Sequence, residues 1–223
     1  MTPNTPMRIA VLFENVQFAD VACLDLLGNC STWFIKASKE FGMGPLLPYA
    51  RDMEFFYVAS STSEPALMTP SFRCVATHTY EDAPRDVDVL LVGGPPLSHR
   101  PEGSLKYMRE VCADGREKVI MSTCVGGMWL AAAGCLDGVR ATTNRGALGA
   151  ARHFHPEVEW LDQRWVVAEK GHLKYWTAGG AGAGGFSIPF YFKVAFIFIF
   201  FIFCCTRFIS IRSETTRFLF CGQ

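Results

Sequence analysis

Apolar residues in this chain gather in short runs, separated by polar or helix-like segments. The runs expected to form strands are residues 7–13, 55–60, 87–92, 119–122, 139–143, 165–167 and 173–177. Such runs are typical of strands buried on both faces of a parallel sheet. Helical segments are expected within 16–28, 105–116 and 125–134. Strands that alternate with helices predict an α/β fold, with a mostly parallel sheet and helices on both faces.

One junction carries a candidate nucleophile. The run 119–122 leads into Cys124, after which Gly126 and Gly127 open an alanine-rich stretch. This order predicts a strand, a sharp turn and a helix, with the thiol at the corner among backbone N–H groups. The positive end of the helix dipole would favour the reactive thiolate. The alternative is a small apolar cysteine that ends a buried strand.

Other polar residues also follow predicted strands, and in parallel sheets sites lie at the carboxyl ends of strands. Gly93 and Gly94 follow the run 87–92, where glycine lets backbone N–H groups approach a ligand. With the N–H after Cys124 they could form an oxyanion hole, although an ordinary tight turn explains them as well. Glu14, after the first strand, is most simply explained as a solvated residue.

Asp20 is the second acidic candidate, and it stands between apolar segments. A buried carboxylate is costly, so it is expected to be hydrogen-bonded or placed for function. The five histidines, His78, His99, His153, His155 and His172, form no recognisable pair with the cysteine, and none is assigned to catalysis.

Composition narrows the class of protein. A length of 223 residues suits one α/β domain. Twenty-one basic and 21 acidic residues give zero net charge, which argues against a nucleic-acid-binding surface. Nine cysteines without a CxxC pair predict neither a zinc site nor a thioredoxin-type motif. The polar, proline-broken start and the reduced-looking thiols predict a cytoplasmic protein.

Residues 186–223 differ from the rest of the chain. They hold 11 of the 19 phenylalanines and a net charge of +3. Three hypotheses apply: a membrane anchor over 186–205, a buried core helix, or sequence foreign to the fold, from a retained intron or a gene-model error. Pro189 and Lys193 interrupt the apolar stretch, so a membrane span is disfavoured. The third hypothesis is preferred, with a domain over 7–185 and a foreign tail over 186–223.

Five motifs, in order, carry a resemblance to a known family. Over residues 7–185 the chain resembles the ThiJ/PfpI superfamily of class I glutamine amidotransferase-like proteins, most of all its fungal and isonitrile-hydratase-like branch. The matching stretches are 17–29, 90–95, 122–127, 133–143 and 175–184. The resemblance implies a flavodoxin-like three-layer sandwich and a small-molecule substrate, without metal or organic cofactor.

The same resemblance implies roles for single residues. Cys124 would be the nucleophile, Asp20 its acid/base partner, and the N–H groups of Gly94 and Val125 the oxyanion hole. Many members have a histidine where this chain has Asn144, so histidine-dependent chemistry is not expected. The match stops at residue 185, where relatives continue into a helix that covers the sheet and often joins a homodimer.

Two functions follow. The first is a cysteine-dependent hydratase or hydrolase that acts on a small electrophile such as an isonitrile, an α-oxoaldehyde or an activated acyl group. The second is a non-enzymatic redox sensor or ligand-binding protein that uses an oxidisable Cys124.

Overall fold

The computed structural model describes residues 5–21 and 23–180. The predicted tail over 186–223, and with it the candidate membrane segment 186–205, lies outside the described residues. Within the described part, every helix is too short or too polar to cross a membrane.

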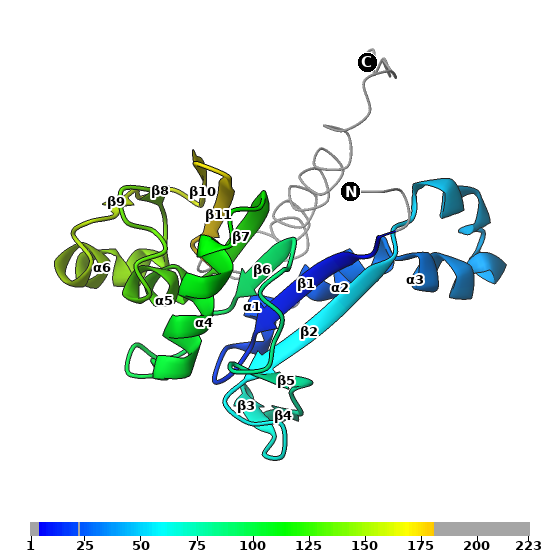
Figure 1. The fold of residues 1–223 in the computed structure, drawn as a ribbon, viewed down its shortest axis with the longest axis horizontal. Helices are drawn as coiled ribbons and strands as arrows, with labels where there is room; N and C mark the ends of the chain where they lie inside the picture. The colour runs from blue at the N-terminus through cyan, green and yellow to red at the C-terminus, as the bar shows by residue number, and fades with distance from the viewer. Residues whose placement is uncertain (1–4, 22, 181–223) are drawn as a thin grey trace, which may run out of the picture. The chain divides into compact units, whose positions relative to one another are not determined.

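A seven-stranded sheet forms the centre of the domain (Figure 1). Its order is β10-β11-β7-β6-β1-β2-β5. All neighbours pair in parallel except β10, which is antiparallel to β11. The strand bounds are β1 Met7–Leu12, β2 Met53–Ala59, β5 His78–Thr79, β6 Val89–Val92, β7 Lys118–Thr123, β10 Trp165–Lys170 and β11 Leu173–Ala178. The predicted mostly parallel sheet is confirmed.

Helices connect the strands in two groups. The segment between β1 and β2 holds α1 Phe18–Val21, α2 Cys23–Asn29, α3 Thr32–Ala37 and the short 3-10 helices η1 Lys39–Phe41 and η2 Gly44–Tyr49. After β6 come α4 Glu102–Ala113, α5 Gly126–Ala132, η3 Arg145–Ala147 and α6 Leu148–Phe154. The first connection leads toward β5 and the later ones toward β10, so right-handed crossovers put the two groups on opposite faces. This is the expected three-layer flavodoxin-like arrangement.

Strand register sets the site. Leu12 of β1 pairs with Val92 of β6, Val92 pairs with Ser122 of β7, and Ser122 pairs with Thr177 of β11. These strands therefore end at one level, and the segments that follow them meet at one edge. The direction of the connections reverses between β1 and β6, and such a switch point is where ligands bind in open α/β sheets.

Burial explains why the central strands form. Residues 9–12 of β1 and 89–92 of β6 are all buried, as is the whole of β7. A strand covered on both faces has no exposed polar side, so its sequence is mostly apolar. The polar residues of β7, Lys118, Ser122 and Thr123, lie at its ends.

Several expectations need correction. The predicted strand 139–143 is reduced to β8, Arg140–Ala141, which pairs with β9, Glu159–Trp160, outside the main sheet. The strand stops because Thr142 and Thr143 turn to other partners: the Thr142 N–H donates to Thr177 Oγ1 at 2.8 Å, and Thr143 Oγ1 donates to the Cys124 carbonyl at 2.9 Å.

Other differences concern boundaries and small elements. The helix expected over 105–116 spans 102–113, because it begins after Pro101 and ends before Gly115, whose φ is 79°. The hairpin of β3 Ala66–Met68 and β4 Phe72–Cys74 was not expected, nor were β5, α3 or α6.

Candidate active site

Cys124 stands at a sharp turn between β7 and α5. Its φ is 55°, in the left-handed region that residues other than glycine rarely adopt. The turn passes close to β6: a Cβ on Gly126 would lie 2.4 Å from the Val92 carbonyl oxygen. The predicted strand, turn and helix are therefore present. A strained backbone of this kind costs on the order of 1–3 kcal/mol and persists only where surrounding contacts hold it.

Hydrogen bonds from distant segments hold the turn. The carbonyl of Cys124 accepts from the Asn144 N–H at 3.2 Å and from Thr143 Oγ1 at 2.9 Å. On the other side, Thr123 Oγ1 donates to the Asp20 carbonyl at 2.9 Å. The turn is thus fixed to α1 and to the segment after β8.

Asp20, Gly94 and Val125 meet the thiol at this turn. The Asp20 side chain is 1% exposed, and its Oδ2 accepts the Gly94 N–H at 3.3 Å. A Cβ on Gly94 would lie 2.9 Å from Cys124 Cβ, 2.9 Å from Val125 N and 3.0 Å from Asp20 Oδ2. Only glycine fits there without displacing its neighbours. All four residues singled out from the sequence therefore lie together.

The electrostatics of the thiol differ from expectation. Burial raises the pKa of Cys124, and the adjacent Asp20 carboxylate raises it further. Hydrogen bonds from the Val125 N–H and the Asn144 amide act in the opposite direction but do not cancel the increase in pKa. The expectation that the helix start would favour the thiolate is wrong in its net result, because burial and the neighbouring carboxylate outweigh the backbone. The resting residue is a neutral thiol.

Asn144 contributes a hydrogen-bond donor to the sulfur. Its Nδ2 lies 3.5 Å from Cys124 Sγ, while its Oδ1 accepts the Gly146 N–H at 3.0 Å. The Gly146 contact fixes the amide orientation, so the NH₂ group faces the sulfur. An amide donates a hydrogen bond but does not take up a proton. Among the described hydrogen bonds and ion pairs, none joins a histidine to Cys124.

The sequence predicts that Glu14 is a solvated residue, and the structure corrects this. Its Oε2 accepts from the Ser60 N–H at 3.0 Å, from Ser60 Oγ at 2.8 Å and from the Tyr80 hydroxyl at 2.9 Å; His99 Nε2 lies 3.6 Å away. Burial raises the pKa of Glu14, but these hydrogen bonds outweigh it and lower the pKa to about 2. Glu14 directly follows a buried strand, at the edge of the sheet that holds the site. This position is the feature of the sequence that indicates a buried, hydrogen-bonded carboxylate.

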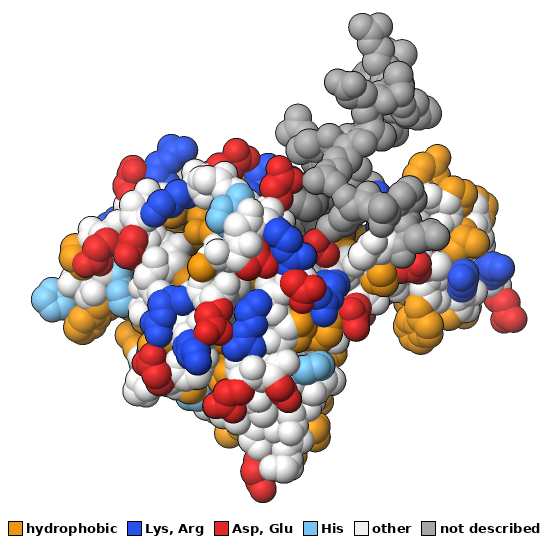
Figure 2. Space-filling model, viewed as in Figure 1, with side chains coloured by type: hydrophobic (Ala, Val, Ile, Leu, Met, Phe, Trp, Pro, Cys, Tyr) orange, Lys and Arg blue, Asp and Glu red, His pale blue; other side chains and the backbone are white. Residues whose placement is uncertain are grey.

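The described residues offer little for other kinds of ligand. No three His, Cys, Asp or Glu side chains of this part of the chain converge as a metal site. On the face shown in Figure 2, basic and acidic side chains are interspersed among neutral ones.

Comparison with known proteins gives the fold. No family model and no curated protein matches the chain. A ThiJ/PfpI family protein from Pseudomonas syringae matches with a TM-score of 0.61 at 20% identity, over 96% of this chain and 78% of that one. An AraC family transcriptional regulator from Pseudomonas putida matches with a TM-score of 0.59 at 18% identity, over 78% and 84%.

A third match is a two-domain protein from Anabaena variabilis with DJ-1/ThiJ/PfpI-like and ferritin-like domains. Its TM-score is 0.56 at 17% identity, over 79% of this chain and 44% of that protein. This chain therefore spans less than half of the length of that relative. The isonitrile-hydratase-like branch stays a prediction, since these matches do not distinguish branches. The sequence motifs and the three-layer architecture agree, and the chain has the fold of the DJ-1/ThiJ/PfpI superfamily.

Proposed function

We propose that the protein is a cysteine-dependent hydratase or hydrolase that acts on a small electrophile through Cys124. The observation that carries this proposal is the convergence of a strained thiol, the buried Asp20 carboxylate and two backbone N–H groups, those of Gly94 and Val125. The fold does not choose the function, since structural neighbours include proteins described as transcriptional regulators. Only the residues of the site therefore favour one function over another.

The first chemical step forms a bond between Cys124 Sγ and an electrophilic carbon. Because the resting residue is a thiol, its proton has to leave as the bond forms, and Asp20 is the adjacent base. Negative charge that develops on the substrate faces the N–H groups of Gly94 and Val125. The Gly94 N–H now donates to Asp20 at 3.3 Å. As Asp20 gains the proton, that hydrogen bond weakens and the N–H becomes available to the substrate.

The second step uses water. Protonated Asp20 returns its proton to the adduct, and the regenerated carboxylate takes a proton from the incoming water. The carbon–sulfur bond then breaks and the thiol is restored. For an isonitrile the sum is addition of one water to give an N-substituted formamide, with no net oxidation or reduction. Asn144 stabilises charge on the sulfur by donating a hydrogen bond, and the proton moves only through Asp20.

A substrate panel with paired variants tests the proposal. The full chain is assayed for hydration of isonitriles and for consumption of methylglyoxal, beside Cys124→Ser. We expect kcat/KM to fall at least about 10³-fold in that variant, because the nucleophile is lost. Cys74→Ser, which removes another half-buried free thiol, serves as the matched control. A substrate that is turned over at the same rate by Cys124→Ser would contradict the proposal.

Gly94→Ala tests the oxyanion hole separately. The new methyl group would lie within 3.0 Å of Cys124 Cβ, Val125 N and Asp20 Oδ2 and fill the space for the substrate anion. We expect a fall of about 10²-fold or more in kcat. Gly103→Ala is the control, since its Cβ would meet nothing closer than 3.4 Å.

The redox-sensor alternative concerns the same cysteine. Peroxides react with thiolates, so burial and a raised pKa make Cys124 a slow peroxide target. Stoichiometric sulfinate at Cys124 after mild peroxide, without turnover of any substrate in the panel, would favour the sensor over the enzyme.

A further inference from the structure

A second polar cluster lies at the carboxyl edge of the sheet, with Glu14 and His99 at its centre. The Glu14 carboxylate accepts hydrogen bonds from Ser60, which follows β2, and from Tyr80, which follows β5. His99 belongs to the segment 93–101, which joins β6 to α4. Side chains that follow four different strands therefore meet here, and the proposed reaction uses none of them.

Contacts on three sides fix the His99 ring. Asn15 Nδ2 donates to His99 Nδ1 at 3.1 Å. An amide NH₂ group only donates, so Nδ1 is the acceptor and the ring proton is on Nε2. Nε2 is shielded from solvent and lies 3.6 Å from Glu14 Oε2. The ring also packs edge-on against Trp129 of α5, with the two centroids 5.7 Å apart. His99 thus contacts both the residues after β1 and the helix that follows the turn at Cys124.

His99 belongs to the same segment as the Gly94 N–H, which is half of the proposed oxyanion hole. Among the residues that the structure describes, His99 makes the one hydrogen bond that runs from a side chain of residues 95–101 to another segment. Arg100, by contrast, donates to the carbonyls of Pro96 and His99 within its own segment. The His99 N–H also donates to the Pro96 carbonyl, at 2.9 Å, and folds the segment back on itself. The contacts of the His99 ring therefore hold the whole segment at the sheet edge.

The residue that donates to this ring is itself held by its backbone. Asn15 has a φ of 58°, in the left-handed region that asparagine enters more readily than most residues. Its N–H donates to the Leu67 carbonyl at 3.0 Å, which joins the turn after β1 to β3. Glycine accepts the same φ, so Asn15→Gly removes the amide and keeps the backbone conformation.

We propose that His99 is a positioning residue for the oxyanion hole. With Asn15 and Glu14 it holds the segment after β6, so that the Gly94 N–H stays beside Cys124. Little displacement is tolerated there, because a Cβ on Gly94 would already lie 2.9 Å from Cys124 Cβ. This inference rests on the proposed function at Cys124. A misplaced N–H would slow reactions that develop an oxyanion and leave the reactivity of the thiol itself unchanged.

Two reagents applied to the full chain separate these effects. With 4-nitrophenyl acetate, Cys124 Sγ bonds to the acetyl carbon through a tetrahedral oxyanion, 4-nitrophenolate leaves, and Asp20 takes the thiol proton. With iodoacetamide, the sulfur displaces iodide from a saturated carbon and no oxyanion forms. Both rates are measured at Cys124 by peptide mass, and Cys124→Ser supplies the background from the other thiols.

Substitutions of His99 give the main comparison. In His99→Ala we expect acetylation of Cys124 to slow at least about 10-fold and alkylation to change less than about 2-fold. His99→Asn should restore most of the acetylation rate, because its Oδ1 can accept from Asn15 in place of Nδ1. His153→Ala, which removes an exposed histidine of α6, should change neither rate.

Asn15→Gly tests the same contact from the other side without altering the segment. Acetylation should slow as in His99→Ala, and the backbone amides of residues 94–100 should exchange hydrogen faster. Combined with His99→Ala, Asn15→Gly should cause little further loss, because both remove one interaction. Ser71→Gly, at another left-handed residue with a φ of 67°, should leave acetylation and exchange unchanged. If His99→Ala does not fold, Asn15→Gly and His99→Asn carry the test.

The outcomes distinguish this inference from the proposed function. Normal acetylation in the unmodified chain and in folded His99→Ala and Asn15→Gly overturns the positioning role alone. Equal slowing of both reagents also overturns it, because the substitution then acts on the thiol and not on the oxyanion hole. If Cys124 of the unmodified chain is acetylated no faster than Cys74, the proposed function fails and the positioning role fails with it.

Discussion

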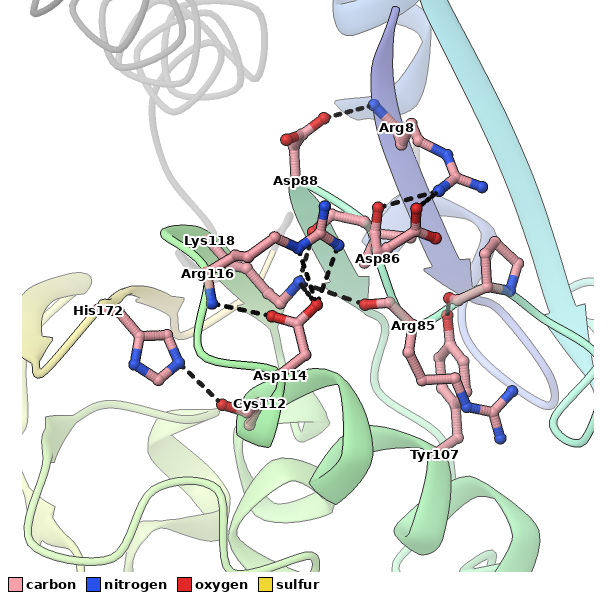
Figure 3. A network of polar contacts seen from close by, with 12 residues as sticks. Arg8, Arg85, Asp86, Asp88, Tyr107, Cys112, Asp114, Arg116, Lys118 and His172 are labelled. Carbon is pink, nitrogen blue, oxygen red and sulfur yellow. Dashed lines mark hydrogen bonds and ion pairs between the residues drawn. The ribbon is translucent and has the colours of Figure 1, made fainter. Parts of the chain in front are cut away.

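The two edges of the same sheet differ in how completely their polar groups are hydrogen-bonded. At the amino edge Lys118 has a fully buried side chain, and its Nζ donates to Asp114 Oδ2 at 2.7 Å and to the carbonyls of Arg85 at 3.2 Å and Val87 at 2.9 Å (Figure 3). The three ammonium hydrogens thus have three acceptors. Arg8 extends the network through ion pairs with Asp86 and Glu54.

At the carboxyl edge, the side-chain contacts of Cys124 and Asp20 are longer. Asn144 Nδ2 meets Cys124 Sγ at 3.5 Å, and the Gly94 N–H reaches Asp20 at 3.3 Å. Buried Ser122 Oγ has no hydrogen-bond partner among the described residues. Cys124 itself is strained. Saturated charges stabilise the domain, whereas strain and long hydrogen bonds leave groups able to exchange partners. The comparison predicts that substitutions at the amino edge change stability and that those at the carboxyl edge change activity.

Lys118→Met should have the largest effect on stability. The substitution takes the ammonium donor away from Asp114 and from the carbonyls of Arg85 and Val87, so we expect a loss of about 3–5 kcal/mol in the free energy of unfolding. Urea denaturation measures this loss, and kcat/KM per folded molecule should not change. Lys106→Met, at an exposed position that also pairs with an acidic residue, should change stability by less than about 1 kcal/mol. Equal losses of stability in the two variants would contradict the stabilising role of the buried Lys118 contacts.

Asp20→Asn should do the opposite. The amide keeps the shape of the side chain but does not accept the thiol proton, so kcat/KM should fall about 10²–10⁴-fold. Stability should change by about 1 kcal/mol or less. Asp25→Asn, in the neighbouring helix and exposed, is the control for nonspecific loss of charge. If Asp20→Asn unfolds the domain and leaves the specific activity of the remaining folded protein intact, Asp20 is structural.

Strain at the nucleophile can be measured with two substitutions that both remove the sulfur. Cys124→Ala keeps a Cβ at φ 55°, while Cys124→Gly relieves the strain. We expect the glycine variant to be the more stable by about 1 kcal/mol, the reverse of the usual order. Thermal or urea unfolding of the pair gives the difference directly. A more stable alanine variant would show that the turn stores no strain.

The smallest expected effect is on the pH dependence of stability, measured by acid titration. Burial raises the pKa of Asp114, but hydrogen bonds from Lys118 and Arg116 outweigh it and bring the pKa to about 2. A folded-state pKa below the ordinary value means that Asp114 contributes stability at neutral pH. That contribution is lost as pH falls from the ordinary aspartate range toward 2. Asp114→Asn should therefore lower stability at pH 7 and flatten its decline between pH 5 and pH 2. A decline as steep as that of the unmodified chain would contradict this assignment.

Much of the architecture was accessible from sequence because the central strands are buried on both faces. Residues 9–13 and 89–92 are apolar without interruption, and the glycines after Cys124 indicate a sharp turn. Short elements escaped prediction: β5 is two residues long and exists only through its pairing with Val58 and Ala59 of β2. Nothing local in its sequence specifies that pairing.

The sequence predicts which residues form the site better than it predicts their pKa values. The motifs bring Asp20 and Cys124 to the same edge, but the direction of the thiol pKa depends on how deeply both are buried and how close they lie. Glu14 likewise owes its low pKa to His99, Ser60 and Tyr80, which come from other segments of the chain. Such pKa shifts depend on distances between segments far apart in sequence. The hydrophobic pattern of the chain does not predict these distances.

The spread of the site along the chain also links activity to folding. Asp20 lies 74 residues from Gly94 and 103 from Thr123. Contacts of such long range form slowly, because the entropy of closing large loops must be overcome before the contacts stabilise the chain. Until β1, β6 and β7 have paired, Cys124 is an ordinary solvated thiol on an unfinished polypeptide. The rate at which enzymatic turnover recovers during refolding would therefore report the rate at which the central strands pair. A collapsed chain without these strand pairs would show no turnover.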